Sequence, residues 1–259
     1  MIPMLVFDLE TIPDAAGLRK LNQWHDLDDD AVVERAFAER EEKTGSTFMP
    51  HYLQQIVAIS CVFRDDSGVR VKSLGQPDDP EEVLITQFFK TIDHYTPQIV
   101  SWNGSGFDLP VLHYRSLIHG LTAVRYWETG KDDRDFKWNN YQSRYHDRHL
   151  DLMDVLARFT GRANAPLDDL AKLCGFAGKL GMDGSQVWSA WQDGKIDEIR
   201  AYCETDVINT WLLTCRFNLM RGELTQQAYD HEVKMVFDLL SQTPGQQWDD
   251  YLQAWNYNA

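Results

Sequence analysis

The sequence contains few cysteines and no long hydrophobic run. Its 259 residues include four cysteines, Cys61, Cys174, Cys203 and Cys215, without a CxxC pair or a Cys/His cluster of zinc-ligand spacing. We therefore expect reduced, packed thiols in a cytoplasmic protein. No stretch reaches the roughly 20 apolar residues that cross a membrane. The apolar run at residues 1–7 lacks a basic leader, so we do not expect it to be a signal peptide.

Positive charge is also scarce. The chain has 25 Lys and Arg against 40 Asp and Glu, a formal net charge of −15. A protein that coats duplex DNA is expected to be basic, so this composition argues against non-specific coating. It leaves open a metal-dependent site that grips a short piece of nucleic acid.

The hydrophobic pattern favours one α/β domain over residues 1–259. The apolar run at 4–7 predicts a central strand covered on both faces. Strands early in the chain, followed by alternating strands and helices, indicate a three-layer arrangement. The other expected strands are 56–63, 69–74 and 99–102. The expected helices are 80–95, 108–119, 150–159, 167–174, 196–215 and 223–240. We also expect an inserted acidic helical excursion at about 14–50, an irregular segment at 122–150 and a polar, aromatic tail within the C-terminal part, 223–259.

Two carboxylates follow the first predicted strand. Side chains alternate along a strand, so Asp8 and Glu10 point to one face, whereas Phe7 and Leu9 point to the other. Open α/β sheets place ligands at the carboxyl ends of strands. The repulsion between two adjacent carboxylates there is relieved by a divalent cation that prefers oxygen ligands, such as Mg²⁺, Mn²⁺ or Ca²⁺. The alternative is that the strand has reached solvent and both acids are hydrated.

A third carboxylate lies on the core-facing side of the predicted helix 196–215. At about 100° per residue, Asp206 projects roughly 20° from Ile199. Tyr202 lies one turn before Asp206 on the same side. An ionised Asp among apolar neighbours needs a partner. Besides a metal, that partner could be a distant Arg or Lys, or water if the helix is rotated.

A fourth carboxylate, Asp108, follows the glycine turn at 103–106. Asp is a favoured N-cap and Pro110 suits a first helical turn, so Asp108 taken alone is interpreted as a helix cap. The turn lacks the GxxxxGKS/T pattern, which excludes a P-loop. Taken with the other three acids and Tyr202, however, Asp108 completes the set that a two-metal phosphodiester site requires.

These motifs resemble those of the DEDD 3′–5′ exonucleases of the tyrosine subclass. They are most similar to stand-alone proteins related to the exonuclease domain of family B DNA polymerases. The resemblance covers about residues 4–220 and implies a ribonuclease-H-like α/β/α fold with a mixed central sheet. The departures are the missing polymerase module and the acidic charge. The matching segments are Val6-Phe7-Asp8-Leu9-Glu10-Thr11, Trp102-Asn103-Gly104-Ser105-Gly106-Phe107-Asp108, Tyr202-Cys203-Glu204-Thr205-Asp206, 149–152 and 179–184.

The resemblance implies roles for the catalytic residues. Asp8 is expected to bridge two Mg²⁺ or Mn²⁺ ions. Glu10 and Asp206 are expected to hold the ion that carries the attacking water, and Asp108 the other ion. Tyr202 is expected to orient the water, because an ordinary tyrosine pKa near 10 argues against a base.

The resemblance also implies substrate contacts. Leu9 and Thr11 are expected to meet the terminal nucleotide, and Asn103 and Phe107 the sugar–phosphate and a base.

Residues 113–149 interleave basic and aromatic side chains. Cations for phosphates beside aromatic faces for unstacked bases bind single strands without sequence preference. We therefore predict that this segment, including Lys137 and Arg144, guides a single-stranded 3′ end to the acids. The alternative is a loop whose aromatic side chains pack on the core while nearby acids cancel its charge.

The predicted function is a two-metal 3′–5′ exonuclease that removes nucleoside monophosphates from single-stranded DNA. Two alternatives stay open: an exoribonuclease that trims RNA ends, and a non-catalytic nucleic-acid-binding module on the same fold. The second alternative predicts an altered ligand, and all four acids are present.

Overall fold

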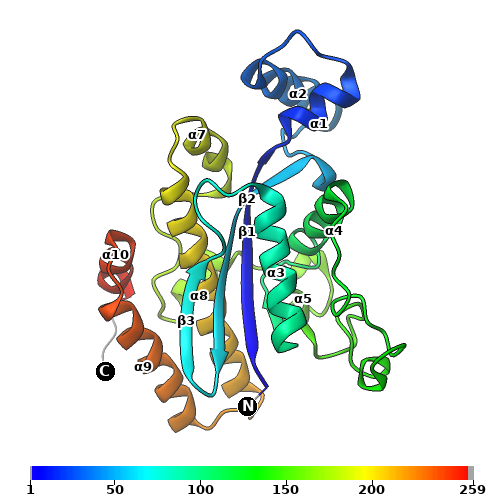
Figure 1. Ribbon diagram of the computed structural model, residues 1–259. Helices are drawn as coiled ribbons and strands as arrows, with labels where there is room; N and C mark the ends of the chain where they lie inside the picture. The colour runs from blue at the N-terminus through cyan, green and yellow to red at the C-terminus, as the bar shows by residue number, and fades with distance from the viewer. Residues whose placement is uncertain (1, 256–259) are drawn as a thin grey trace.

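A five-stranded mixed sheet forms the centre of the molecule in the computed structural model, which describes residues 2–255 (Figure 1). The strand order is β3-β2-β1-β4-β5. The strands β1, β2 and β3 pair antiparallel, whereas β1, β4 and β5 pair parallel. Their bounds are β1 Met4–Pro13, β2 Gln54–Asp65, β3 Gly68–Ser73, β4 Gln98–Ser101 and β5 His149–Asp151.

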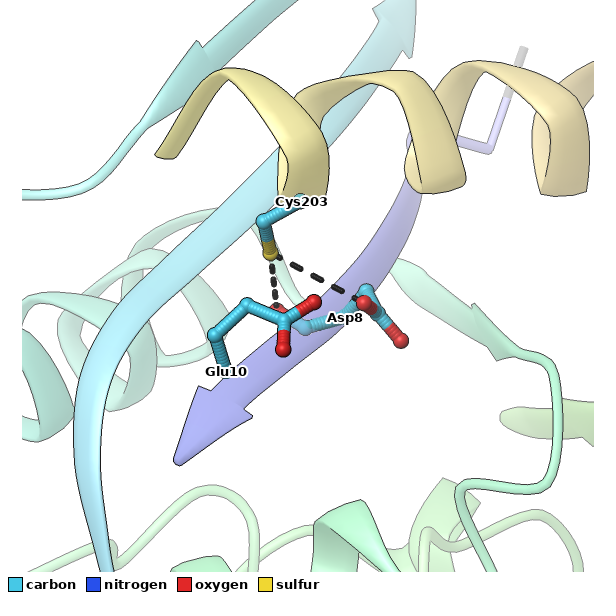
Figure 2. Close-up of side chains that lie close together, drawn as sticks. All are labelled: Asp8, Glu10 and Cys203. Atoms are coloured by element: carbon cyan, nitrogen blue, oxygen red, sulfur yellow. Dashed lines mark hydrogen bonds between the residues drawn. The ribbon is translucent and has the colours of Figure 1, made fainter. Parts of the chain in front are cut away.

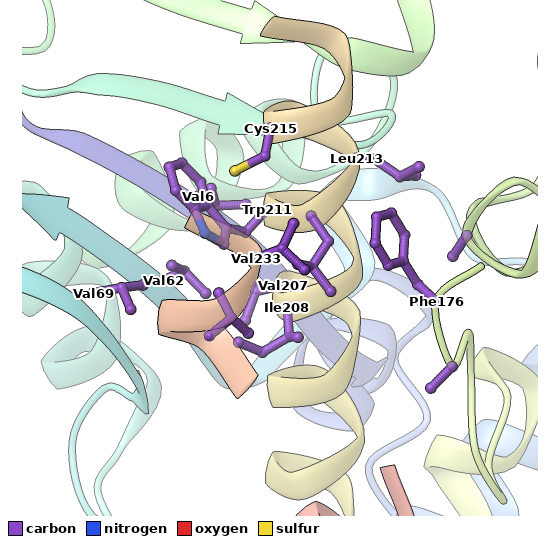
Figure 3. Packing of buried hydrophobic residues seen from close by; sticks show 14 of the residues in the cluster. Val6, Val62, Val69, Phe176, Val207, Ile208, Trp211, Leu213, Cys215 and Val233 are labelled. Atoms are coloured by element: carbon purple, nitrogen blue, oxygen red, sulfur yellow. The ribbon is translucent and has the colours of Figure 1, made fainter. Parts of the chain in front are cut away.

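Helices cover both faces of this sheet, as the apolar run in β1 predicts. On one face, Leu5 and Phe7 pack in a core with side chains of α3 (Glu81–Tyr95) and α4 (Asp108–His119). On the other face, Val6 packs with α8 (Ile196–Met220) and α9 (Gln226–Gln242), as Figure 3 shows for Val6, Val207, Trp211 and Val233. The ribonuclease-H-like α/β/α fold with a mixed central sheet is thus confirmed.

The acidic excursion is helical, as expected, and consists of α1 (Ala15–Asn22) and α2 (Asp29–Thr44). Both helices stand beyond the carboxyl end of β1, at the top of Figure 1. They share a small core of their own, with buried Leu18, Val32 and Met49. Because β1 and β2 pair as far as Pro13 and Gln54, both ends of the excursion are fixed to the sheet.

The remaining helices are short: α5 (Leu152–Leu156), α6 (Leu167–Leu173), α7 (Val187–Gln192) and α10 (Gln246–Trp255). Two expectations are wrong here. Leu150 lies in a strand that pairs with β4, and helix α5 starts only after it. The described part of the C-terminal tail contains α10, because its apolar side chains Trp248, Tyr251 and Trp255 share one buried face.

Two further expectations from the sequence can be compared with the structure. The four cysteines are free, and Cys61, Cys203 and Cys215 are buried. Within residues 2–255, no helix combines the length and apolar character that a membrane span requires.

Candidate active site

The carboxyl end of β1 opens into a cavity of about 570 Å³. Asp8 and Glu10 line it from β1, Asp108 from the start of α4, and Tyr202 from α8. Lys179, from the loop after α6, is the only Lys or Arg among the described residues that line it. Segments distant in the sequence therefore converge on one acidic site.

Asp8 and Glu10 project from the same face of β1 toward α8, as the alternation of the strand predicts (Figure 2). Burial raises the pKa of Asp8 well above its ordinary value, and the charges of Asp108 and Asp206 raise it further. Burial likewise raises the pKa of Glu10, with further contributions from Asp8 and Asp206. The buried carboxylates therefore repel one another, and a bound cation would relieve this repulsion. Two acids hydrated at an open strand end, the alternative interpretation, would not be buried in this way.

Asp108 does not cap α4, so its interpretation as a helix cap is wrong. The helix begins at Asp108 itself, with Phe107 at the N-cap position. The Asp108 carboxylate turns instead toward β1 and accepts a hydrogen bond from the Leu9 amide at 3.2 Å. Burial raises the pKa of Asp108 to about 7, and Asp151 adds to the shift.

The glycine turn before α4 is held by a residue that sequence reasoning did not single out. The carboxylate of Asp151, at the end of β5, accepts hydrogen bonds from the backbone amides of Asn103 at 3.0 Å and Ser105 at 2.8 Å. Gly104 is required in this turn, because a Cβ there would collide with the side chain of Ser101. Asp151 thus positions the turn that carries Asp108.

The helical-wheel prediction for α8 is confirmed, because Tyr202 and Asp206 are both buried on its sheet-facing side. The salt bridge left open as an alternative is also present. Lys179 Nζ lies 2.5 Å from both Asp206 Oδ2 and the Tyr202 hydroxyl. Burial and then the charges of Asp206, Glu10 and Asp8 raise the pKa of Tyr202, so the phenol stays protonated.

Lys179 is the site residue whose role sequence reasoning missed, although its segment carries part of the family resemblance. Its amide donates to Asp168 Oδ1 at 2.7 Å. The carbonyl of the preceding Gly178 accepts from Asn209 Nδ2 at 2.8 Å, and Asn209 accepts in turn from the Tyr251 hydroxyl at 2.7 Å. The lysine is therefore oriented by contacts that reach α10.

Cys203 lies close to the two β1 carboxylates (Figure 2). Its thiol donates to the Asp8 carbonyl at 3.5 Å and approaches Asp8 Oδ2 at 3.7 Å. Burial, with the charges of Asp8 and Glu10, raises the pKa of this thiol well above its ordinary value. Since a metal-ligating cysteine must be a thiolate, Cys203 is better suited to packing α8 on β1.

The predicted substrate residues fall into three groups. Leu9, Asn103 and Phe107 line the acidic cavity. Thr11 lines an adjoining cavity, where its hydroxyl donates to Gln54 Oε1 at 3.0 Å. Lys137 and Arg144 are exposed and are not among the described residues that line either cavity.

The segment that carries Lys137 and Arg144 packs at the opposite end of the sheet. The Tyr141 hydroxyl donates to the Pro97 carbonyl just before β4, and Phe136 lies between the guanidinium groups of Arg125 and Arg148. Much of the aromatic and basic composition of 113–149 therefore serves packing, whereas Trp138 and Tyr145 are exposed. The role of Lys137 and Arg144 stays a prediction.

The donor set fits divalent cations. Four carboxylates supply the hard oxygen ligands that Mg²⁺ and Mn²⁺ prefer. Asp206 Oδ1 is buried and has no hydrogen-bond partner among the described residues. A buried carboxylate oxygen without a partner is unfavourable, and a cation ligated there would satisfy it.

Comparisons with known proteins identify relatives of this chain. A family model described as "Predicted 3'-5' exonuclease related to the exonuclease domain of PolB" matches residues 46–255. A DNA polymerase of Archaeoglobus fulgidus is 24% identical over 174 residues, which cover 66% of this chain. The structure of the family B DNA polymerase from the hyperthermophilic archaeon Pyrobaculum calidifontis aligns with a TM-score of 0.52 at 18% identity, covering 85% of this chain.

The chain spans only a small part of these relatives. The matches cover 21% of the Archaeoglobus polymerase and 25% of the Pyrobaculum chain. At these identities the structural match shows a shared fold.

Proposed function

The chain belongs to the family of predicted 3′–5′ exonucleases related to the exonuclease domain of PolB, and from this we propose that it removes nucleoside monophosphates from the 3′ end of single-stranded DNA. The observation that carries the proposal is the cavity lined by Asp8, Glu10, Asp108 and a protonated Tyr202, with the buried Asp206 near enough for its charge to raise the pKa of Asp8, Glu10 and Tyr202. Asp8, Glu10 and Asp108 line one cavity, and the charge of Asp206 reaches both Asp8 and Glu10, which supports an enzyme over a binding module.

Two Mg²⁺ or Mn²⁺ ions held by the four carboxylates would supply an activated water and neutralise charge on the scissile phosphate. Lys179 donates to the Tyr202 oxygen, and the Tyr202 hydroxyl also hydrogen-bonds to the Asp206 carboxylate. With a cation on that carboxylate, the hydroxyl hydrogen would be able to donate toward the attacking water or the phosphate. The raised pKa of Tyr202 makes it a hydrogen-bond donor and not a base. Phe107 and Asn103 would contact the nucleotide that carries the scissile bond.

The proposal is tested with 5′-labelled single-stranded oligomers of matched sequence, one DNA and one RNA. With Mg²⁺ or Mn²⁺ we expect a ladder shortened from the 3′ end and free nucleoside monophosphates, and chelator should stop both. Faster digestion of RNA would reassign the substrate to RNA ends. If neither oligomer is digested with either metal, the proposed activity is wrong.

The stability of the metal-free protein is expected to decrease as the pH rises from about 4 to about 7. Asp108 has a folded-state pKa of about 7, above the ordinary value of 3.8. Between these values the folded state binds more protons than the unfolded state, so deprotonation destabilises the fold by up to about 1.4 kcal/mol per pH unit. Urea unfolding in chelator at several pH values measures the slope.

Asp108→Asn should flatten this pH dependence, because the amide does not titrate. Added Mg²⁺ or Mn²⁺ should raise the melting temperature more at pH 8 than at pH 5, since protons compete with the cation for the carboxylates. An identical pH slope in Asp108→Asn and the parent protein would contradict the assignment.

Replacing both Lys137 and Arg144 with Ala is expected to weaken binding of single-stranded DNA if they contact phosphates. Each lost phosphate contact should reduce the slope of log affinity against log salt by about 0.7. The matched control replaces Lys43 and Lys234, which are exposed on α2 and α9. Unchanged affinity and salt slope would exclude this segment from the binding path.

A further inference from the structure

A second cavity, of about 370 Å³, continues the acidic one toward the excursion. The two cavities share Leu9, Glu10 and Phe107 as lining residues. The far wall of the second cavity is made by α2 and the loop after it, through Phe37, Phe48 and Met49. The excursion therefore contributes one side of a cleft whose other side holds the proposed catalytic acids.

An aromatic shelf, formed by Phe48, His51 and Phe107, borders this second cavity. The ring of Phe107 lies 5.7 Å from the rings of both Phe48 and His51. His51 Nε2 also lies within hydrogen-bond distance, 2.9 Å, of the Gly106 carbonyl in the turn before α4. Phe48 is 54% exposed, so its ring covers little core and is accessible from the cavity.

The shelf is held in place from several directions. The side chain of Gln54 accepts from Thr11 and donates to the Met49 carbonyl at 3.0 Å, which fixes the loop to β1. On the far side of the excursion, Trp188 of α7 packs against its small core, and Gln192 donates to Asp30 at 2.7 Å. A preorganised wall of this kind loses little entropy when a ligand binds.

We propose that the aromatic shelf binds a nucleobase within two nucleotides of the 3′ end by stacking on the exposed ring of Phe48, which Phe107 supports at an interplanar angle of 53°. The inference rests on the proposed exonuclease function and names an additional substrate subsite. No Lys or Arg occurs among the described residues that line the second cavity, and Glu10 is acidic, so the lining disfavours a phosphate. Flat rings with the hydroxyls of Ser46, Thr47 and Ser185 match an uncharged base instead.

The subsite is tested with two 5′-fluorescein-labelled oligothymidylates, one intact and one with abasic sugars at its last two positions. Binding is measured by anisotropy in chelator, and hydrolysis with Mn²⁺. The parent protein should bind the intact strand about tenfold more tightly, since stacking on one aromatic residue contributes roughly that factor. Phe48→Ala should lower this ratio several-fold, because Phe107 remains, whereas Phe48→Tyr, which keeps the ring, should retain it.

Tyr95→Ala is the matched control, because Tyr95 is 46% exposed at the end of α3 and packs on Phe63, at 4.7 Å between ring centres. It should leave the ratio at the parent value. If Phe48→Ala still prefers the intact strand tenfold while hydrolysis proceeds, the shelf is not a base subsite and the exonuclease proposal stands. If the parent protein neither binds nor digests either strand, both proposals fall.

Discussion

Asp8→Asn is expected to reduce exonuclease activity by at least about 10³-fold while leaving the metal-free fold intact. Burial raises the pKa of Asp8, and the charges of both Asp108 and Asp206 raise it further, so Asp8 interacts with acids of two other elements. An amide in its place supplies only a neutral oxygen, so the cation is bound less tightly. The cation stabilises the charge of the transition state by several kcal/mol, and much of this stabilisation would be lost. Initial rates of nucleotide release at saturating Mn²⁺ measure the effect.

The same substitution should maintain or raise the melting temperature in chelator at pH 8, because it removes one of several repelling charges. Asp197→Asn is the matched control, since Asp197 is exposed in the first turn of α8 and should leave both quantities unchanged. Activity near the parent level in Asp8→Asn would contradict the catalytic assignment. A large loss of stability would point to a structural role for the carboxylate.

Local periodicity predicts the parts of this site that lie within single elements. Strand alternation places Asp8 and Glu10 on one face, and the helical wheel places Tyr202 and Asp206 on the buried side of α8. The strand pattern holds because packing of β1 against helices on both sides fixes where its side chains point. Tyr202 and Asp206 are buried as predicted, although α8 is buried on all sides from Thr205 to Cys215 and not on one face alone. The prediction that Asp108 caps the helix was wrong because its carboxylate accepts a long-range hydrogen bond from the Leu9 amide instead.

Contacts between distant segments are what the sequence does not reveal. Lys179 lies in a loop, which has no periodicity, and its partners lie 23 and 27 residues later. Asp151 acts on a turn 46 to 48 residues earlier. In both cases the partner is brought close only by the tertiary fold, so local sequence patterns do not predict the contact. The only indication that these two segments matter was their resemblance to segments of the family.

Arg115→Met is expected to destabilise the protein by about 3–5 kcal/mol, which is the effect of leaving buried carboxylates without their cation. Arg115 is 4% exposed, and its guanidinium lies 2.6 Å from Glu81 and 2.5 Å from Asp14. Burial lowers the pKa of Arg115, but the two acids raise it by more. Methionine fills much of the same volume, so the loss is electrostatic, and urea unfolding at pH 7 measures it.

The exposed pair of Arg35 and Glu39 provides the control, and Arg35→Met should change stability by less than about 0.5 kcal/mol. Adding Asp14→Asn and Glu81→Gln to Arg115→Met should recover part of the loss, because the uncompensated charges are then removed. Without that recovery, the loss would have to be assigned to packing.

The position of Arg115 links this stability effect to the substrate cleft. Asp14 also accepts from the Gly17 amide at 2.8 Å and so caps α1, the first helix of the excursion. In Arg115→Met that cap loses its anchor, and the wall that carries Phe48 should be held less firmly. We therefore expect the Arg115→Met variant, where it remains folded, to discriminate less between intact and abasic 3′ ends. An unchanged ratio would show that the contacts of Gln54 and Trp188 suffice to hold the wall.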